Sequence, residues 1–323
     1  FNEIVVPTAD YARSFYLMKI LLTNQAHVLM PGPIGTGKSV NAFSLLSKGL
    51  TDAYTSLSIT LSAQTPSKLI LETIWDQVER RRKGVYGPPQ RKKCIVLIDD
   101  LNMPKKDDYG SQPPLELIRQ YLDHKHWYIF KPQKDYIEIE DIIMLAAMGP
   151  PGGGRNFITN RLVRHFNIIS YAELQDSAIM SIFKQILSSI FMRFDEDFKG
   201  MTDKLVQANI NVYNEAKVIL LPKPGKSHYL FNLRDIAKVF QGICRSHPRF
   251  AKDAFDAARV WYHENMRVYH GRLTTQEDRN LLINLLKTEI TKMDLNVDEV
   301  LNAERIIFVD FMQGRDIDNP PYH

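Results

Sequence analysis

The sequence predicts an α/β fold: a five-stranded parallel sheet flanked by helices, followed by a smaller α-helical domain. Two patterns along the chain carry this prediction. Up to about residue 170, short β-rich runs alternate with helical stretches, as in a parallel sheet covered by helices on both faces. Beyond about residue 172 the strand patterns fade and amphipathic helical stretches replace them. We therefore expect a large domain at residues 1–171 and a small helical domain with a C-terminal extension at 172–323.

Five apolar runs are the expected strands of the sheet. They are residues 27–31, 57–62, 94–99, 142–148 and 166–170. The dipeptide Pro33-Ile34 and its neighbours connect the first strand to a helix that is expected to end near Gly49. Thr65-Pro66-Ser67 is expected to open a helix that runs to about Arg82, and Pro113-Pro114 a helix that runs through Tyr121.

Two further segments of the first domain predict hairpins. The runs Trp127–Phe130 and Tyr136–Ile139 flank a turn and indicate a β-hairpin before the fourth strand. The basic stretch Arg80–Lys93 has one aromatic residue and no stacking platform for bases, so it favours an exposed hairpin or partner contact over a nucleic-acid site.

The second domain is predicted to be helical almost throughout. Its expected helices are residues 175–191, 202–221, 232–243, 250–268 and 276–292, with one late strand at 306–311. Residues 222–227 are expected to form a loop between two of these helices.

The composition is that of an ordinary globular protein, with 44% hydrophobic and 24% charged residues among 323. No segment reaches the apolar length of a membrane span, and a formal charge of +4 is too small to demand an anionic polymer as partner. We therefore expect neither nucleic acid nor membrane as a partner. Cys94 and Cys244 lie far apart without metal-ligand spacing, which indicates a reducing compartment.

The most specific motif is G-x-x-x-x-G-K-S at Gly32–Ser39, between an apolar run and a helical stretch. Glycines here let successive backbone N–H groups point into one concavity, and the lysine reaches the phosphates of a nucleotide. The motif predicts a site for a nucleoside di- or triphosphate, ATP or ADP. The alternative is that the glycines only form a turn that joins a strand to a helix, without binding a ligand. The predicted nucleotide-binding residues are Pro33, Ile34, Gly35, Thr36, Gly37, Lys38, Ser39 and Val40.

A magnesium site is expected beside this motif. The hydroxyl of Ser39 is a typical Mg²⁺ ligand, and Ile95–Asp99 is an apolar strand that ends in a carboxylate. Asp99 is the predicted acidic partner of Ser39 at the metal. The alternative is that Asp99 only caps a strand before a turn.

These residues resemble the AAA+ modules of dynein heavy chains, most closely the third of the six modules and the axonemal branch. The strings that carry the resemblance are Ile4–Thr8, Leu97–Pro104, Tyr109–Pro114, Met148–Asn156, Arg161–Phe166, His228–Asp235 and Trp261–Glu264. They span nearly the whole first domain and extend into the second. The resemblance implies an AAA+ P-loop nucleoside triphosphatase fold with a helical lid.

The resemblance also implies weak hydrolysis. Asp100 stands where hydrolysing relatives usually place a Glu as the base, and aspartate is one methylene shorter. A misplacement of about 1 Å can cost on the order of a hundredfold in rate. At the end of the fourth strand, AAA+ proteins commonly place a polar residue, often Asn, between the attacking water and the terminal phosphate. This chain has Met148-Gly149 there, so a second polar contact is missing. Hydrolysis through some other residue remains the alternative.

Several further residues take roles from the resemblance. After the glycine run come Arg155, Arg161 and Arg164, and an arginine here is expected to reach the nucleotide of the adjacent module, unless these arginines form only a solvated face. The resemblance leaves this role open between Arg161 and Arg164. In the lid, Arg234 is expected to reach the terminal phosphate. The adenine is expected to lie against Val5 and Val6.

The function expected from these features is a regulatory ATP- or ADP-binding module of an axonemal dynein heavy chain, a microtubule motor of cilia and flagella in the cytoplasm and cytoskeleton. Its partners would be neighbouring modules of the same chain and, through the full motor, the microtubule and other dynein chains. Two alternatives stay open: an active AAA+ enzyme that remodels protein or nucleic acid, and a small-molecule P-loop kinase.

Overall fold

The computed structural model of the chain describes residues 4–129, 135–302 and 306–309. It divides into two compact units. One is Ala9–Glu173, and the other joins the described part of Phe1–Thr8 to that of Leu174–His323. The segment before Ala9, which was predicted with the first domain, groups with the helical unit, where Val6 packs against the apolar core.

The first unit is built on a five-stranded parallel sheet in the order β2-β5-β8-β1-β9. The strands are β1 (Val28–Pro31), β2 (Tyr54–Thr60), β5 (Lys93–Asp99), β8 (Ile142–Met148) and β9 (Asn167–Ile168). The predicted five-stranded sheet is thus confirmed, with β2 starting earlier than expected and β9 reduced to two residues. Because β1 lies between β8 and β9 and is parallel to both, the segment that follows β1 lies beside the C-terminal ends of these two strands.

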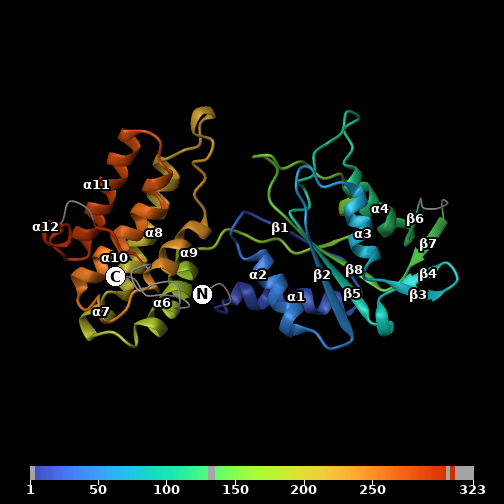
Figure 1. Cartoon of the computed structure of the whole chain (residues 1–323), viewed down its shortest axis with the longest axis horizontal. Coiled ribbons are helices and arrows are strands. Elements are labelled where there is room, and N and C mark those ends of the chain that lie inside the picture. The colour runs from blue at the N-terminus through green and yellow to red at the C-terminus, as the bar shows by residue number, and fades with distance from the viewer. Residues whose placement is uncertain (1–3, 130–134, 303–305, 310–323) are drawn as a thin grey trace. The chain divides into compact units, whose positions relative to one another are not determined.

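Helices cover both faces of this sheet (Figure 1). Ile95 and Leu97 of β5 belong to the core under α1 (Ala9–Thr23) and α2 (Lys38–Ser44), which continues as a π-helical turn, Leu45–Gly49. The alternate residues Val96 and Ile98 belong to the core under the helices on the other face. Those helices are α3 (Ser67–Trp75) and α4 (Pro113–His124). All these β5 residues are buried, as expected for a central parallel strand.

The helix predicted to run to Arg82 is wrong in its second half. α3 ends at Trp75, and Glu79–Arg82 instead forms strand β3, antiparallel to β4 (Val85–Gly87) across a turn with Gly84 at φ 77°. Glu79–Arg82 contains no apolar residue to continue the helical spacing that ends at Val78, and pairing with the adjacent strand β4 decided its conformation. The predicted hairpin in the basic stretch is confirmed.

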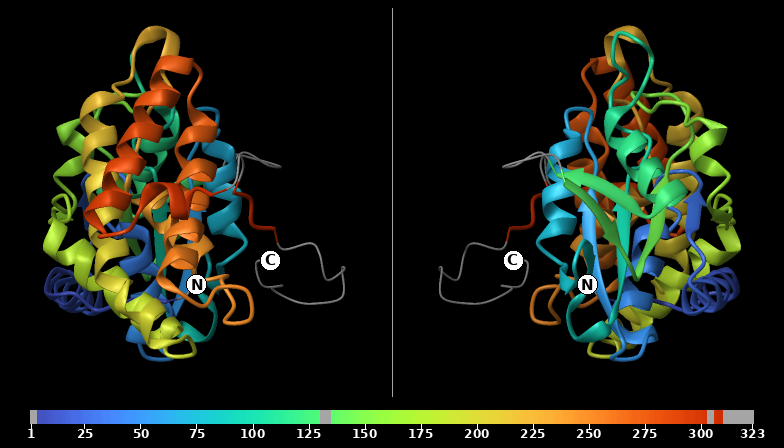
Figure 2. Two further views of the ribbon diagram at one scale, coloured as in Figure 1. Left: turned by 90° about the vertical axis from the view of Figure 1, so that its left-hand side faces the viewer. Right: turned by 90° about the vertical axis from the view of Figure 1, so that its right-hand side faces the viewer.

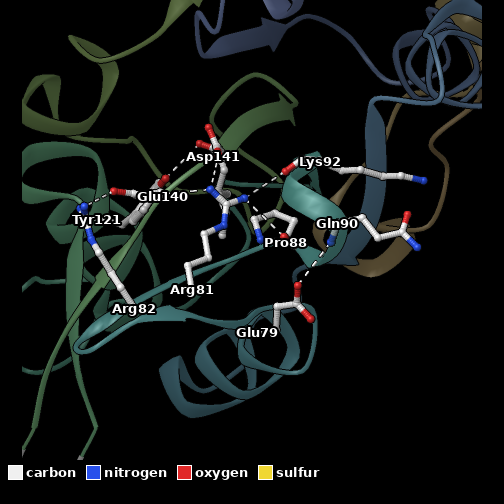
Figure 3. A network of polar contacts seen from close by, with 10 residues as sticks. Glu79, Arg81, Arg82, Pro88, Gln90, Lys92, Tyr121, Glu140 and Asp141 are labelled. Carbon is white, nitrogen blue, oxygen red and sulfur yellow. Dashed lines mark hydrogen bonds and ion pairs between the residues drawn. The ribbon is translucent and has the colours of Figure 1, made fainter.

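A second, four-stranded sheet has the order β3-β4-β7-β6. Its antiparallel pair β6 (His126–Ile129) and β7 (Asp135–Ile139) confirms the other predicted hairpin, although Phe130 lies outside the described residues. The parallel pairing of β4 with β7 was not predicted. Figure 3 shows how Arg81 of β3 secures this sheet, by pairing with Asp141 and donating to the carbonyl oxygens of Pro88 and Lys92, both at 3.3 Å.

The second unit is helical (Figure 2). Its helices are α6 (Asp176–Phe191), α7 (Glu196–Gly200), α8 (Thr202–Ile219), α9 (Leu233–Ile243), α10 (Ala254–Val268), α11 (Gln276–Lys292) and α12 (Val297–Val300). The α8 helix contacts both α6 and α11, and α9 packs against α10. Three mutually packed rings, Phe191, Phe194 and Phe198, and the fully buried Trp261 fill the core.

Two predictions for this unit need correction. The α10 helix begins at Ala254 rather than Phe250, because Asp253 caps its first turn by accepting from the Asp256 N–H. The late strand predicted at 306–311 is absent from residues 306–309, and residues 310 and 311 lie outside the described part of the chain. Among the described residues, no helix is long and apolar enough to cross a membrane.

Candidate functional site: a phosphate loop and its acidic partners

The glycine motif forms a tight turn between β1 and α2, as predicted. Gly35 and Gly37 both have positive φ angles, 85° and 82°, which side chains with a Cβ adopt only at a cost. Gly37 is the residue before the first turn of α2, and its carbonyl accepts from the Asn41 N–H at 2.9 Å. The loop therefore presents backbone N–H groups at the start of a helix, which is the geometry that binds phosphate.

Lysine 38 lies folded over the loop. Its Nζ donates to the carbonyl oxygens of Gly32 at 2.8 Å and Pro33 at 2.5 Å, and Thr36 Oγ1 is 3.4 Å away. Thr36 in turn donates to the Pro33 carbonyl at 3.0 Å. Ile34 and Val40 are exposed beside the turn. An ammonium group held against this loop is a suitable counter-charge for polyphosphate.

The predicted metal pair is brought together. Ser39 Oγ donates to Asp99 Oδ2 at 2.7 Å, although the two residues are sixty positions apart. Asp99 Oδ1 also accepts from the Asp100 N–H at 3.0 Å, so the carboxylate is oriented from both sides. A hydroxyl and a carboxylate at the end of a strand form an all-oxygen donor set, which fits Mg²⁺.

Asp100 is not free beside this pair. Its Oδ1 accepts from Arg155 Nη2 at 3.0 Å in an ion pair, with 37% of the Asp100 side chain and 17% of the Arg155 side chain exposed. Asp100 also has a positive φ of 53°. The sequence contained both residues, but it did not indicate that they meet.

Polar side chains of the neighbouring segments fix the loop that carries Arg155. Asn102, which is 1% exposed, donates to the Gly149 carbonyl at 2.8 Å. Gln112 and Asn156 both donate to the Pro104 carbonyl, at 2.6 and 2.9 Å. These side chains had no individual role in the sequence prediction. The structure shows that Asn102 and Asn156 hold the segments after β5 and β8 together, whereas Gln112 joins two parts of the segment after β5.

The two other arginines of this region differ in their surroundings. Arg161 lies on the short helix α5 (Asn160–Val163), is exposed, and forms no ion pair with the residues that the structure describes. Arg164 pairs with Asp123 at 2.8 Å, in a group that also contains Arg119 and His165. Leu162 between them is buried in the core, so the helix turns both arginines away from it.

The comparisons with known proteins agree with this geometry. Residues 1–174 match the family model described as the P-loop containing dynein motor region, and residues 205–303 match the AAA+ lid domain. The chain belongs to the dynein motor family. The resemblance to dynein heavy chains found in the sequence is therefore confirmed, while the likeness to the third module stays a prediction. The P-loop makes this dynein module a nucleotide-binding protein.

Among curated proteins, the dynein module is 42% identical to dynein axonemal heavy chain 1 of Mus musculus over 98% of its own length. It is 41% identical to dynein axonemal heavy chain 3 of Homo sapiens over 88% of its length, and 41% identical to dynein axonemal heavy chain 2 of Mus musculus over 97%. In each case the chain spans only 7% or 8% of the length of the relative.

In the helical unit of this dynein module, Arg234 lies in the first turn of α9 and is exposed. Asn232 caps that turn by accepting from the Arg234 N–H at 2.9 Å, and Asp235 completes a capping box with the Asn232 N–H. Asp235 is 2% exposed and is paired with Arg272, which also stacks over Phe231. The position of Arg234 is therefore firmly held by its own helix.

The remaining predicted residues, Val5 and Val6, are half-buried and group with the same helical unit. Their contact with an adenine, and the contact of Arg234 with a phosphate, stay predictions.

Proposed function

We propose that this chain is a regulatory nucleotide-binding module of an axonemal dynein heavy chain, which holds ATP or ADP with Mg²⁺ and hydrolyses ATP slowly or not at all. The observation that carries the proposal is the Ser39–Asp99 contact beside the lysine-capped loop, because it unites the phosphate and metal ligands at one edge of the sheet. The likeness to the third module of the dynein ring supports a regulatory role over a motor role.

Each chemical group has a defined task in this proposal. The amides of Gly35, Thr36 and Gly37 with the Lys38 ammonium neutralise the phosphates, and Ser39 and Asp99 hold the magnesium ion. The bound metal would supply charge neutralisation between the phosphates. Slow hydrolysis is supported by Asp100, because a carboxylate that is short by one methylene and neutralised by Arg155 is a poor base.

The arginine that serves the adjacent module is proposed to be Arg161. A residue that acts across an interface must be exposed and available, and Arg161 meets both requirements among the described residues. Arg164, with 63% of its side chain exposed, is instead engaged by Asp123, which is 11% exposed. Arg234 is proposed to reach the terminal phosphate from the lid, and Val5 with Val6 to contact the adenine.

The biological setting follows from the relatives. These relatives are named axonemal heavy chains, so we propose the axoneme of cilia or flagella as the location of the full protein. The proposed partners are the neighbouring AAA+ modules of the same chain and, through the complete motor, the microtubule and other dynein chains.

Calorimetric titration of the purified chain with ADP and with ATP tests this function. We expect an ADP dissociation constant in the micromolar range or below, a loss of at least tenfold in Lys38→Ala, and ATP turnover barely above background. The matched control is Lys19→Ala, which removes an exposed lysine on α1 and should bind as the wild type does.

Two results would contradict the proposal. A folded sample that gives no heat with either nucleotide would remove the binding function. Turnover of about one per second would instead favour an active enzyme over a regulatory site. Mass spectrometry of the nucleotide that copurifies with the chain provides an independent check, since a retained diphosphate indicates a slow site.

A further inference from the structure

Arg155 lies close to the phosphate loop, and the proposed function uses it only as the partner that neutralises Asp100. Its guanidinium lies against the backbone of Gly149, directly after β8. A Cβ atom added to Gly149 would sit 2.6 Å from Arg155 Nε and 2.8 Å from its Cδ, which is closer than real Cβ contacts. Any side chain at position 149 would therefore occupy the space that the arginine fills.

The contacts on both sides of this arginine connect it to the phosphate loop. Gly149 follows Met148, whose carbonyl accepts from the Gly32 N–H at 3.2 Å, where the loop begins. On the other side, the partner of Arg155 is Asp100, which follows the predicted metal ligand Asp99. The guanidinium thus lies between the ends of β5 and β8, at the same edge of the sheet as the loop.

The arginine is also held in place from its own backbone. Residues 152–155 form a small turn in which the Gly152 N–H donates to the Arg155 carbonyl at 3.0 Å and the Arg155 N–H donates back at 3.1 Å. The three glycines of this turn all have positive φ angles, between 57° and 117°. Such a backbone favours glycine, so the glycine run sets the direction in which the side chain of Arg155 leaves the turn.

The donors of Arg155 are only partly used. Nη2 is the guanidinium nitrogen that donates to Asp100, whereas Nε is buried and has no hydrogen-bond partner among the described residues. A buried N–H without an acceptor destabilises the arrangement that contains it. The guanidinium of Arg155 therefore loses little when it moves toward a stronger acceptor. A phosphate group is such an acceptor, because it is negatively charged and two of its oxygens can accept from the planar fork of the guanidinium.

We propose that Arg155 determines the preference of this site for a nucleoside triphosphate over a diphosphate, by placing its guanidinium between Asp100 and the terminal phosphate. The inference rests on the proposed nucleotide-binding function. It assigns a specificity role to a residue of the same chain, in addition to the arginine expected from a neighbouring module. Asp100 then serves as the anchor that orients the guanidinium.

The test compares the affinity of the full chain for ADP with that for a non-hydrolysable ATP analogue, both with Mg²⁺, by calorimetry. We expect Arg155→Met to weaken binding of the triphosphate analogue at least tenfold and to change ADP binding by less than threefold. Arg155→Lys, which keeps the charge but loses the planar fork, should recover part of the selectivity. The control Arg82→Ala removes a mostly exposed arginine of β3, in the second sheet, that pairs with Glu140, and it should alter neither affinity.

A second variant tests the inference independently, in case Arg155→Met does not fold. Gly149→Ala keeps the charge but displaces the arginine, so it should lower the affinity for the triphosphate analogue and leave ADP binding as it was. Equal losses for both nucleotides, or no loss for either, would overturn the inference. Absence of ADP binding to the wild type would instead overturn the proposed function, so the two failures are distinguishable.

Discussion

The glycine that opens the phosphate loop is held by close backbone contact, and this makes Gly32→Ala a sharp test of the fold at the site. A Cβ at position 32 would lie 2.5 Å from the Tyr171 carbonyl oxygen and 2.7 Å from the Tyr171 Cβ. Neither atom can rotate away as the end of a flexible side chain could. The alanine must therefore push β1 and the segment after β9 apart.

The cost follows from the contacts that this movement disturbs. Overpacking a well-packed site costs typically about 1–3 kcal/mol. The movement also strains the 2.8 Å hydrogen bond from the Tyr171 N–H to the Pro31 carbonyl, and a lost hydrogen bond adds roughly 0.5–1.5 kcal/mol. We expect Gly32→Ala to lower the free energy of unfolding by about 2–4 kcal/mol. It should also weaken ADP binding, because the Gly32 carbonyl is an anchor of Lys38.

Urea unfolding followed by tryptophan fluorescence measures this loss, since Trp75 and Trp127 both lie in the α/β unit. The matched control is Gly37→Ala, where an added Cβ meets no atom within 4 Å but the backbone has a φ of 82°. That variant carries only the left-handed backbone penalty of about 1–2 kcal/mol. If Gly32→Ala unfolds within about 0.5 kcal/mol of the wild type, the reasoning from the close approach to Tyr171 is refuted.

Two further predictions concern charge. Asp99→Asn keeps an oxygen for the Ser39 hydroxyl but removes the negative charge, so the gain in ATP affinity on adding Mg²⁺ should fall by roughly 10- to 100-fold, the equivalent of about 1.5–3 kcal/mol. Calorimetry with and without EDTA measures this gain, and an unchanged gain would argue against Asp99 as the metal partner. Burial, assisted by Lys125, lowers the pKa of His27 to about 4, and its Nδ1 accepts from the Met144 N–H. Between pH 6.5 and 4 the unfolded chain binds a proton that the folded chain does not, so stability should fall over this range by up to on the order of 3 kcal/mol, as measured by urea unfolding. His27→Gln should show a flatter pH dependence, and identical curves for the two proteins would contradict the assignment.

Much of the fold and of the site followed from local patterns in the chain. The phosphate loop could be recognised because its glycines, Lys38 and Ser39 are contiguous, and the conformation of a tight glycine turn is set by the residues within it. The position of Asp99 beside Ser39 could be predicted because the carboxyl ends of parallel strands meet at one edge of a sheet, while its role at a metal stays a prediction. The buried strand β5 and the long amphipathic helices α6 and α11 were predicted nearly to the residue, because their periodicity is a property of each segment alone.

The sequence by itself thus determined the sheet strands, the long helices, the phosphate loop and the family. Only the tertiary structure decided three contacts: the parallel pairing of β4 with β7, the pairing of Arg155 with Asp100, and the engagement of Arg164 by Asp123. Each joins residues far apart in the chain, and each depends on which strands and helices become neighbours. Local periodicity carries no information about such partners, because the energy of an ion pair or of a strand pairing exists only once the fold has brought the two groups together.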